Sequence, residues 1–421
     1  MVTGALREVR SRQAAATPYS LCLLVGLGGL FAGVTGPLLS NYVPLLVRDV
    51  LGEQRTLIGF VMAIDNVLLL LLVPWAGSVS DRATARGGGR LPLVLGGFAL
   101  SAAGMAFFPW SPRFGLAGLI AATILLYTGI NVQRSPFQAL VADLVPSRYR
   151  SLATGSVTFQ MCVGAIVFLM LGRILGMKLA FVTAAATVLA IGGAFALWLR
   201  EPRTSVAAGS PEAVESLASA AWSIARGALP GLRTIFISTL LLQLTFQTFT
   251  TWYALHGIER FGVRAEDVTI GFIAWAIGGV IGALPAGLIG VRLGRRNTML
   301  LGLAVMAVSL VALDRVDGIR EATPLIALAA AAWTFPMVNA YPLFVEQIPR
   351  PRRGVIAALF VLCMAGGAIG DPLNGALFDF FGQYRSMFLL MAVYTALAFV
   401  AVLFVPAGVG EAGSAPEPML G

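Results

Sequence analysis

Long apolar runs, repeated along almost the whole chain and separated by short charged segments, are the feature that most limits what this sequence can fold into. Each run is about 20 residues long, which is the length that a helix needs to cross the hydrocarbon core of a bilayer. Of the 421 residues, 58% are hydrophobic and only 12% are charged, a composition far from that of a water-soluble globular protein. The sequence therefore predicts an all-α integral membrane protein.

Apolar runs bounded by charged residues predict twelve transmembrane helices. The predicted spans lie near residues 19–45, 57–79, 91–110, 116–140, 152–172, 179–199, 232–256, 268–290, 298–313, 323–345, 355–377 and 386–406. We expect an N-terminal bundle at 1–200, a cytoplasmic linker at 201–230, a C-terminal bundle at 231–410 and a tail at 411–421. Within the linker, apolar residues at helical spacing allow either a short interfacial helix or a segment without regular structure.

The two halves repeat each other's charged loops. Gly77 and Arg82 reappear 210 positions later as Gly287 and Arg292. The segment ADLVPSRYR at 142–150 likewise reappears as VEQIPRPRR at 345–353. Corresponding loops in two halves are typical of duplicated transporters, in which the substrate path lies between the halves. We therefore expect two pseudo-symmetric six-helix bundles.

Lys and Arg are distributed unequally between the two sets of loops. With a cytoplasmic N-terminus, 18 of these residues fall in cytoplasmic segments and 10 in external segments. Cytoplasmic loops of membrane proteins carry such an excess. We predict a multi-pass protein of the cell (inner) membrane with both termini in the cytoplasm, and a retained first helix rather than a signal peptide.

Several classes of function find no support in the sequence. The net charge of +9 comes from arginines placed between apolar runs, so topology explains it better than a nucleic-acid partner. Cys22, Cys162 and Cys363 all lie inside apolar runs, where a cysteine acts as a small apolar residue. The glycine-rich runs are not followed by a P-loop lysine. We predict no enzyme activity, no metal and no cofactor.

A charged hairpin at 73–92, VPWAGSVSDRATARGGGRLP, connects the second and third spans. Its pattern G-x-x-x-D-R-x-x-x-R-x-G-x-R resembles the loop signature of the major facilitator superfamily and is filled by Gly77, Asp81, Arg82, Arg86, Gly88 and Arg90. The resemblance implies the major facilitator fold, with a loop that gates alternating access. The gating residues expected are Gly77, Asp81, Arg82, Arg86, Arg90, Asp143, Arg150, Glu346 and Arg353. In the second half Val291 takes the place of the acid, so control is expected to rest on the first copy.

A narrower resemblance concerns the same hairpin and the fourth span. The residues that carry it are Pro74, Gly77, Ser80, Asp81, Arg82, Gly89, Arg90 and Pro92, with Asn131, Pro136, Ala139, Leu140, Ala142, Asp143 and Pro146 in the fourth span. They look like those of the glycoside-pentoside-hexuronide cation symporters and the related sucrose/proton symporters. Bacterial members often have an acid just before the proline of the second span, contributing to a cation site. Val73 stands there in this chain, which argues against sodium coupling through that position.

Ionisable residues inside apolar runs are costly to bury, by at least ~2.5–3.5 kcal/mol, so we expect them to face a cavity or a partner. Asp65 lies about eight residues into the second span, hence ~12 Å deep at 1.5 Å per residue. Such a carboxyl can take up a proton on one side of the membrane and release it on the other. The alternative is a carboxylate held in a structural pair. Asp371, near the end of the eleventh span, is expected to brace a helix end.

The fourth span has one polar face, formed by Tyr127, Asn131, Arg134 and Gln138 at spacings of four, three and four. A mid-membrane arginine can hold an anion, order sugar hydroxyls or pair with an acid whose charge changes. The expected substrate and coupling residues are Asp65, Asn131, Arg134, Gln138, Gln160, Gln243, Gln247 and Asn339. Amides beside aromatic rings suit a sugar, with Phe31, Trp252 or Tyr253 available to stack on it.

We expect a secondary transporter that works as a monomer in the lipid bilayer on a small-molecule substrate, by proton-coupled symport of a sugar or glycoside. The alternative within transport is proton-coupled efflux of a drug or metabolite. Antiporters of the superfamily tend to have a Gly-Pro-rich motif in the fifth span, and this span, SLATGSVTFQMCVGAIVFLMLG, has no proline. A membrane receptor on the same fold is a third possibility, against which the intramembrane charges argue.

Overall fold

The computed structural model describes residues 18–146, 149–199, 201, 232–347, 362–364 and 366–405. Within these ranges the regular secondary structure is helical. The helices are α2 (Pro18–Leu51), α3 (Arg55–Ala85), α4 (Leu91–Phe107), the 3-10 helix η1 (Phe108–Phe114), α5 (Gly115–Leu144), α6 (Arg150–Leu175), α7 (Met177–Trp198), α9 (Leu232–Phe261), α10 (Ala265–Leu293), α11 (Arg295–Leu313), α12 (Ile319–Gln347), α14 (Gly367–Phe381) and α15 (Met387–Leu403). A helix pairs its own backbone N–H and C=O groups, which a segment inside a bilayer must do.

Each of the twelve predicted spans overlaps one described α-helix, with α14 covering only the later part of the span 355–377, and this confirms the all-α membrane fold. Eight stretches of the described chain are long and apolar enough to cross a membrane, and one of them, 91–144, contains both α4 and α5. α9 lies outside this set because Gln and Thr residues interrupt its apolar sequence. α14 lies outside it because its described part has only 15 residues.

The chain packs into two compact units, and one of them contains 1–38, 71–113 and 121–206. In this unit α7 packs on both α4 and α6. Phe98 of α4 lies at the centre of an aromatic core, with its ring 4.7 Å from that of Phe31 and 5.6 Å from that of Phe195. Phe31 is therefore buried in the packing of the helices and is not available to stack on a sugar.

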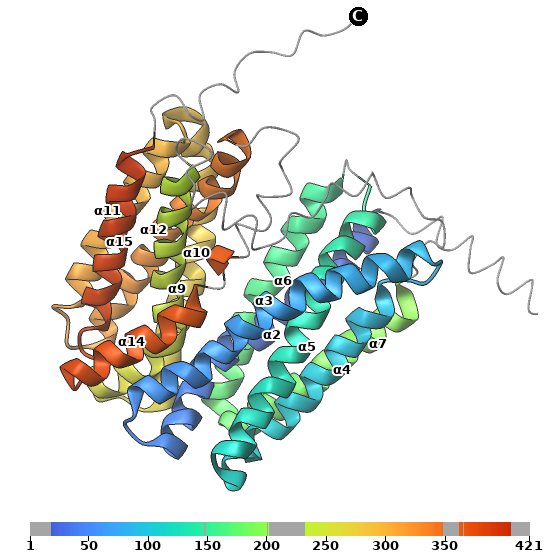
Figure 1. The fold of residues 1–421 in the computed structure, drawn as a ribbon, viewed down its shortest axis with the longest axis horizontal. Coiled ribbons are helices and arrows are strands. Elements are labelled where there is room, and N and C mark those ends of the chain that lie inside the picture. Colours follow the sequence, from blue (N-terminus) through green and yellow to red (C-terminus); the bar gives the residue numbers. More distant parts are fainter. Residues whose placement is uncertain are drawn as a thin grey trace, which may run out of the picture. The chain divides into compact units, whose positions relative to one another are not determined.

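The other unit contains 39–70, 114–120 and 207–421. Here α12 packs on α10 and α11, and α15 packs on α9 and α11 (Figure 1). The first parts of α3 and the last part of α2 belong to this unit, although they come from the N-terminal half of the sequence. The predicted linker, apart from Glu201, and the predicted tail lie outside the described residues, and the domain boundaries stay a prediction.

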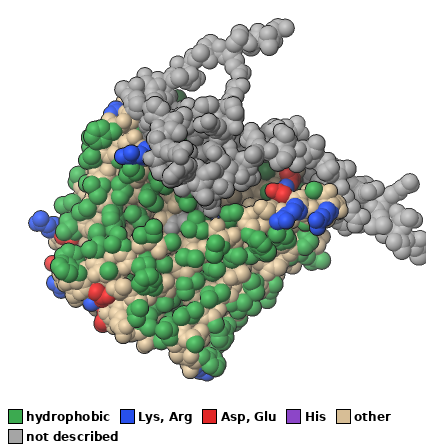
Figure 2. Space-filling view, in the orientation of Figure 1, with side chains coloured by type: hydrophobic (Ala, Val, Ile, Leu, Met, Phe, Trp, Pro, Cys, Tyr) green, Lys and Arg blue, Asp and Glu red, His purple; other side chains and the backbone are tan. Residues whose placement is uncertain are grey.

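Large apolar side chains point away from the protein on many helices. Figure 2 shows them spread over the visible face of the described helices. Phe159 of α6, Ile174 of α6 and Val308 of α11 are each more than two thirds exposed. Extensive exposed apolar surface marks a membrane contact rather than a water-soluble surface. Together with the apolar helices, it identifies a multi-pass membrane protein.

Candidate functional site

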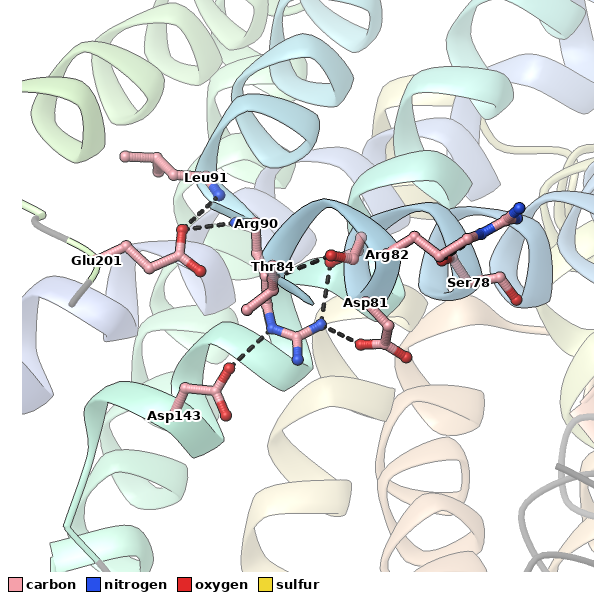
Figure 3. A network of polar contacts seen from close by, with 9 residues as sticks. Ser78, Asp81, Arg82, Thr84, Arg90, Leu91, Asp143 and Glu201 are labelled. Carbon is pink, nitrogen blue, oxygen red and sulfur yellow. Dashed lines mark hydrogen bonds and ion pairs between the residues drawn. The ribbon is translucent and has the colours of Figure 1, made fainter. Parts of the chain in front are cut away.

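The charged hairpin between α3 and α4 forms a closed set of polar contacts, shown in Figure 3. We call it the Arg90 network, and it consists of Ser80, Asp81, Arg90, Asp143 and Glu201. The guanidinium of Arg90 donates to Asp143 Oδ2 at 2.8 Å through Nε, and to Ser80 Oγ at 3.1 Å and Asp81 Oδ1 at 2.5 Å through Nη1. Its backbone N–H donates to Glu201 Oε2 at 2.6 Å. One arginine therefore joins the ends of α3, α4 and α5 to the segment after α7.

Charge matching keeps the Arg90 guanidinium ionised. Partial burial lowers the pKa of Arg90, but the hydrogen bonds to Asp81 and Asp143 outweigh this and raise the pKa above its ordinary value. Nearby, α3 and α5 approach closely at Gly77, where a Cβ would lie 2.8 Å from Ser135 Oγ. Gly77 allows α3 and α5 to approach, and the Arg90 network joins the ends of the same two helices.

The other predicted gating residues lie in different surroundings. Arg82 donates from Nε to the carbonyl oxygen of Ser78 in its own helix at 3.1 Å, and Arg86 is exposed. The side chains of Arg150 and Glu346, and all of Arg353, lie outside the described residues. The structure therefore brings together Asp81, Arg90 and Asp143 from the predicted set.

The opposite end of α3 carries a second group of charged contacts, within the other compact unit. We call it the Arg55 clamp, and it consists of Arg55, Thr56, Glu259, Asp379 and Tyr384. Asp379 of α14 accepts hydrogen bonds from the Thr56 N–H at 2.8 Å and the Thr56 hydroxyl at 2.6 Å. The Arg55 guanidinium lies 3.8 Å from carboxylate oxygens of both Glu259 and Asp379, and 4.6 Å from the centre of the Tyr384 ring. The clamp fastens the start of α3 to α9 and α14.

Inside the same unit, polar side chains from α3, α9 and α14 meet at Asp371. We call this group the Asp371 cluster, and it consists of Asp65, Gln247, Thr251 and Asp371. Asp371 is completely buried (0% exposed). Its Oδ2 accepts a hydrogen bond from Gln247 Nε2 at 3.4 Å, and its carboxyl also has a hydrogen bond with the Thr251 hydroxyl. The Asp65 carboxyl is close enough to repel a negative charge on Asp371. Two of the predicted residues, Asp65 and Gln247, are thus brought together around an acid that sequence analysis had placed at a helix end.

Close helix packing covers the Asp371 cluster. Gly59 of α3 lies against the backbone of Asp371, and a Cβ on Gly59 would collide with its carbonyl oxygen. Asn66, next to Asp65 in sequence, is also buried against α14 beside Gly367. Asp371 and Thr251 are therefore buried, whereas Asp65 and Gln247 are partly exposed. Such an arrangement can hold and exchange a proton because a buried carboxyl near a like charge favours its neutral form.

The polar face of α5 lies in the first unit. Asn131 is buried, and its Nδ2 donates to the Tyr127 carbonyl oxygen at 3.0 Å. Arg134 and Gln138, one and two turns further along, are exposed on the surface of the unit. An exposed guanidinium and amide within a membrane helix are available to a ligand, whereas the Asn131 amide N–H is used in a hydrogen bond to the backbone of its own helix.

Three further predicted residues make contacts between helices. Gln160 Nε2 donates to the Leu23 carbonyl oxygen at 2.9 Å, tying α6 to α2. Asn339 Nδ2 donates to the Ala286 carbonyl oxygen at 3.3 Å, tying α12 to α10. Gln243 Nε2 contacts Met364 Sδ at 2.8 Å, and its Oε1 is buried without a hydrogen-bond partner among the described residues. Gln243 is therefore the member of this set with unused hydrogen-bonding capacity.

An aromatic wall lies beside Gln243 and Gln247 on α9. Phe246 stacks on Trp333 at 4.9 Å between ring centres, and Trp275 lies 6.1 Å from Trp333. The Trp333 indole N–H is buried and has no partner within the described part of the chain. Trp252 and Tyr253, which the sequence offered for stacking on a sugar, are completely buried in the helix packing instead.

Comparison with protein families gives one match that covers most of the chain. The family model described as Major Facilitator Superfamily matches residues 21–313 and 235–419. An uncharacterized symporter of Synechocystis sp. is 27% identical over 159 residues. That match covers 35% of this chain and 29% of the relative, so the chain aligns with less than a third of that protein's length.

Solved structures resemble this chain over nearly its whole length. The nucleoside transporter NupG has a TM-score of 0.73 at 13% identity, covering 91% of this chain and 100% of that one. A bacterial homologue of the human lysosomal transporter Spinster, in an inward-facing and occupied conformation, has a TM-score of 0.70 at 13% identity, covering 93% and 97%. A D-xylose–proton symporter has a TM-score of 0.67 at 18% identity, covering 94% and 98%. At these identities the likeness concerns the fold.

Proposed function

The chain belongs to the major facilitator superfamily, and from that premise we propose that it is a proton-coupled symporter of a sugar or glycoside working by alternating access. The Asp371 cluster carries this proposal, because in it the predicted coupling acid Asp65 interacts with the completely buried carboxyl of Asp371. A buried carboxyl is neutralised by one proton at little structural cost, whereas its ionised form needs a cation or several donors. The proton is therefore the coupling ion that these residues suit.

The sugar or glycoside part of the proposal is supported by the aromatic wall on α9, α10 and α12. Trp333 in this wall, and Gln243 one turn before Phe246 on α9, each have a buried polar atom without a partner among the described residues. Binding sites for small molecules combine mostly apolar walls with a few polar groups that fix orientation. A sugar offers hydroxyls to the amides and an apolar ring face to the aromatics. Arg134 and Gln138 of α5, which are exposed, stay proposed substrate residues from the sequence.

The names of two similar proteins also support symport. The relative from Synechocystis is described as a symporter, and one structural neighbour is a D-xylose–proton symporter. Efflux of a drug or metabolite by proton antiport is the alternative. We further propose that the protein acts as a monomer in the cell (inner) membrane with both termini in the cytoplasm, which places the Arg90 network on the cytoplasmic side and the Arg55 clamp on the outer side.

Proton flux in proteoliposomes tests this function. Sugars, glycosides, nucleosides, amino acids and hydrophobic cations are first screened for a rise in the melting temperature of the purified protein, because a ligand of the folded state stabilises it. The best compound is then added outside vesicles that contain a pH-sensitive dye. Symport predicts acidification of the lumen, and antiport predicts the opposite sign. No movement of protons with a transported compound would contradict proton coupling, and protein-free vesicles are the control.

The contribution of Arg134 is tested in the same assay. Arg134→Ala is expected to weaken binding of the screened compound, seen as a smaller rise in melting temperature. Gln138→Ala, one turn away on the same face, shows whether the effect depends on the charge. Unchanged binding and transport in Arg134→Ala would remove it from the substrate site.

A further inference from the structure

We propose that Asp371 is itself a proton-binding site of the transport cycle, closed while α3 packs on α14 and opened when the two helices part. The inference deepens the proposed function and rests on it, since it names the group that carries the coupled proton. The sequence-based expectation was different: it assigned proton binding to Asp65 alone and expected Asp371 to brace a helix end.

Burial and hydrogen bonding favour a neutral Asp371. Its carboxyl is completely buried, and Oδ1 has no hydrogen-bond partner among the described residues. The two groups that contact the carboxyl, Gln247 and Thr251, are uncharged. Among the ion pairs between described side chains, none includes Asp371. A carboxylate buried in this way is strongly destabilised, and a proton removes the cost.

The charged residues around Asp371 point in the same direction. α3 contributes Asp65, a like charge, and neighbouring carboxyls favour one shared proton. α9 contributes the neutral Gln247 and Thr251. The cation at that end of α3, Arg55, is engaged with Glu53 and with the clamp residues Glu259 and Asp379. Among the ion pairs between described side chains, the site therefore offers a proton acceptor without a competing cation.

The packing of α3 on α14 controls access to Asp371. Gly59 covers the backbone of Asp371, and Thr56, one turn before it, bonds to Asp379 two turns after Asp371. A proton can reach the carboxyl from water only when this contact loosens. Opening of the clamp, uptake of the proton and closure would then follow in sequence, with Gln247 and Thr251 as donors whenever the carboxyl is ionised.

Infrared spectroscopy of the reconstituted full-length protein tests proton binding directly, with the proton as the probe. On transfer from H₂O to D₂O, a protonated carboxyl shows a C=O band that shifts as the acidic hydrogen exchanges. Such a band is expected in the wild type and is expected to be lost in Asp371→Asn. Asp317→Asn, which changes an acid with 83% of its side chain exposed, is the matched control and should leave the band in place. A band that persists in Asp371→Asn would overturn the proposal.

A reversible lock tests the gate. Thr56→Cys and Asp379→Cys are combined in a chain whose three natural cysteines are alanine, since Thr56 Oγ1 and Asp379 Oδ2 lie 2.6 Å apart. Oxidation is expected to slow hydrogen exchange at the carboxyl by about tenfold or more, because exchange requires local opening. Reduction should restore the rate. Equal rates in the oxidised and reduced forms would show that α3 and α14 do not control access.

Flux measurements separate failure of this inference from failure of the proposed function. If wild-type vesicles acidify with substrate and Asp371→Asn vesicles do so equally, only the assignment of Asp371 is wrong. If wild-type vesicles transport the compound without moving protons, the coupling proposed above fails, and with it the part of Asp371 as carrier. Asp371→Glu, which keeps an ionisable group, is expected to retain proton movement that Asp371→Asn loses.

Discussion

The two ends of α3 hold charged contacts of different kinds. At the Asp81 end, the Arg90 network joins the ends of α3, α4 and α5 to the segment after α7, and the guanidinium of one arginine contacts both Asp81 and Asp143. At the Arg55 end, the clamp and the Asp371 cluster join α3 to α9 and α14, about 200 to 320 residues away in the chain. One end therefore braces helix ends with matched charges, and the other holds a buried acid that takes part in none of the ion pairs between described side chains.

The difference indicates a division of tasks along one helix. Matched charges at the Asp81 end stabilise one arrangement of helix ends. In the proposed cycle, the buried acid at the Arg55 end makes the packing of α3 on α14 depend on a proton. The proposed cycle requires both, since a proton can drive transport only if its binding changes which ends of the helices are held together.

Removing the central arginine should produce the largest change at the Asp81 end. Arg90→Ala removes the guanidinium that Ser80, Asp81 and Asp143 share, while the backbone N–H that donates to Glu201 remains, and the expected loss is about 1.5–3 kcal/mol of stability. Arg86→Ala, an exposed arginine of the same hairpin, should unfold at nearly the wild-type temperature. Equal melting temperatures for the two variants would show that the network is not a brace.

Adding one methyl group at each end of α3 compares the two packing contacts directly. Gly59→Ala meets the backbone of α14, which cannot move aside, and is expected to disfavour the closed contact by about 1–3 kcal/mol. Gly77→Ala meets the Ser135 hydroxyl, which can rotate away, so its effect should be smaller. Cross-linking of cysteines at 56 and 379 should fall in Gly59→Ala and not in Gly77→Ala. A larger fall in Gly77→Ala would reverse the comparison.

The smallest effect is expected at the Arg55 clamp, where low pH should weaken the contact of Asp379 with Thr56. Asp379 lies beyond the predicted span 355–377; burial raises the pKa of its carboxyl, but hydrogen bonds from Thr56 and Arg55 outweigh this and lower the pKa. Because the pKa of Asp379 is lower in the folded state than in the unfolded state, its carboxylate stabilises the fold fully at a pH above the usual pKa of about 3.9. This stabilisation is lost as the pH falls through the lowered pKa.

Asp379→Asn therefore should cost about 0.5–1.5 kcal/mol at neutral pH, and the difference from wild type should vanish in acid. Thermal unfolding as a function of pH measures it, with Asp317→Asn as the exposed control. A difference in melting temperature that grows towards low pH would contradict a lowered pKa of Asp379 in the folded protein.

The same comparison explains what the sequence could predict. Three members of the Arg90 network, Asp81, Arg90 and Asp143, were among the predicted gating residues because they lie in one short hairpin and at the exit of the fourth span, where the pattern is local. Glu201, which lies beyond the sixth span, was not predicted. The twelve spans were predicted because the apolar length needed to cross a bilayer is a property of each segment alone. α9 shows the limit of that signal, since its Gln and Thr residues lower its apolar character below that of the other long helices.

The Asp371 cluster could not be assembled from the sequence because its members come from three helices far apart in the chain. Asp65 and Gln247 were predicted as coupling residues, but nothing local to them indicates Asp371 as their partner. The signal available was an acid between Gly370 and Pro372 within an apolar run, which was interpreted as a brace at a helix end. Burial of its carboxyl depends on the close approach of α3 at Gly59, which only tertiary packing determines.

Proton uptake driven by substrate in proteoliposomes tests the central claim most directly. The compound selected by thermal shift is added outside vesicles that contain wild-type protein or Asp65→Asn, with a pH-sensitive dye in the lumen. The wild type is predicted to acidify the lumen, and Asp65→Asn is predicted to show no substrate-driven acidification while still binding the compound. Equal acidification by both proteins would contradict proton coupling through Asp65.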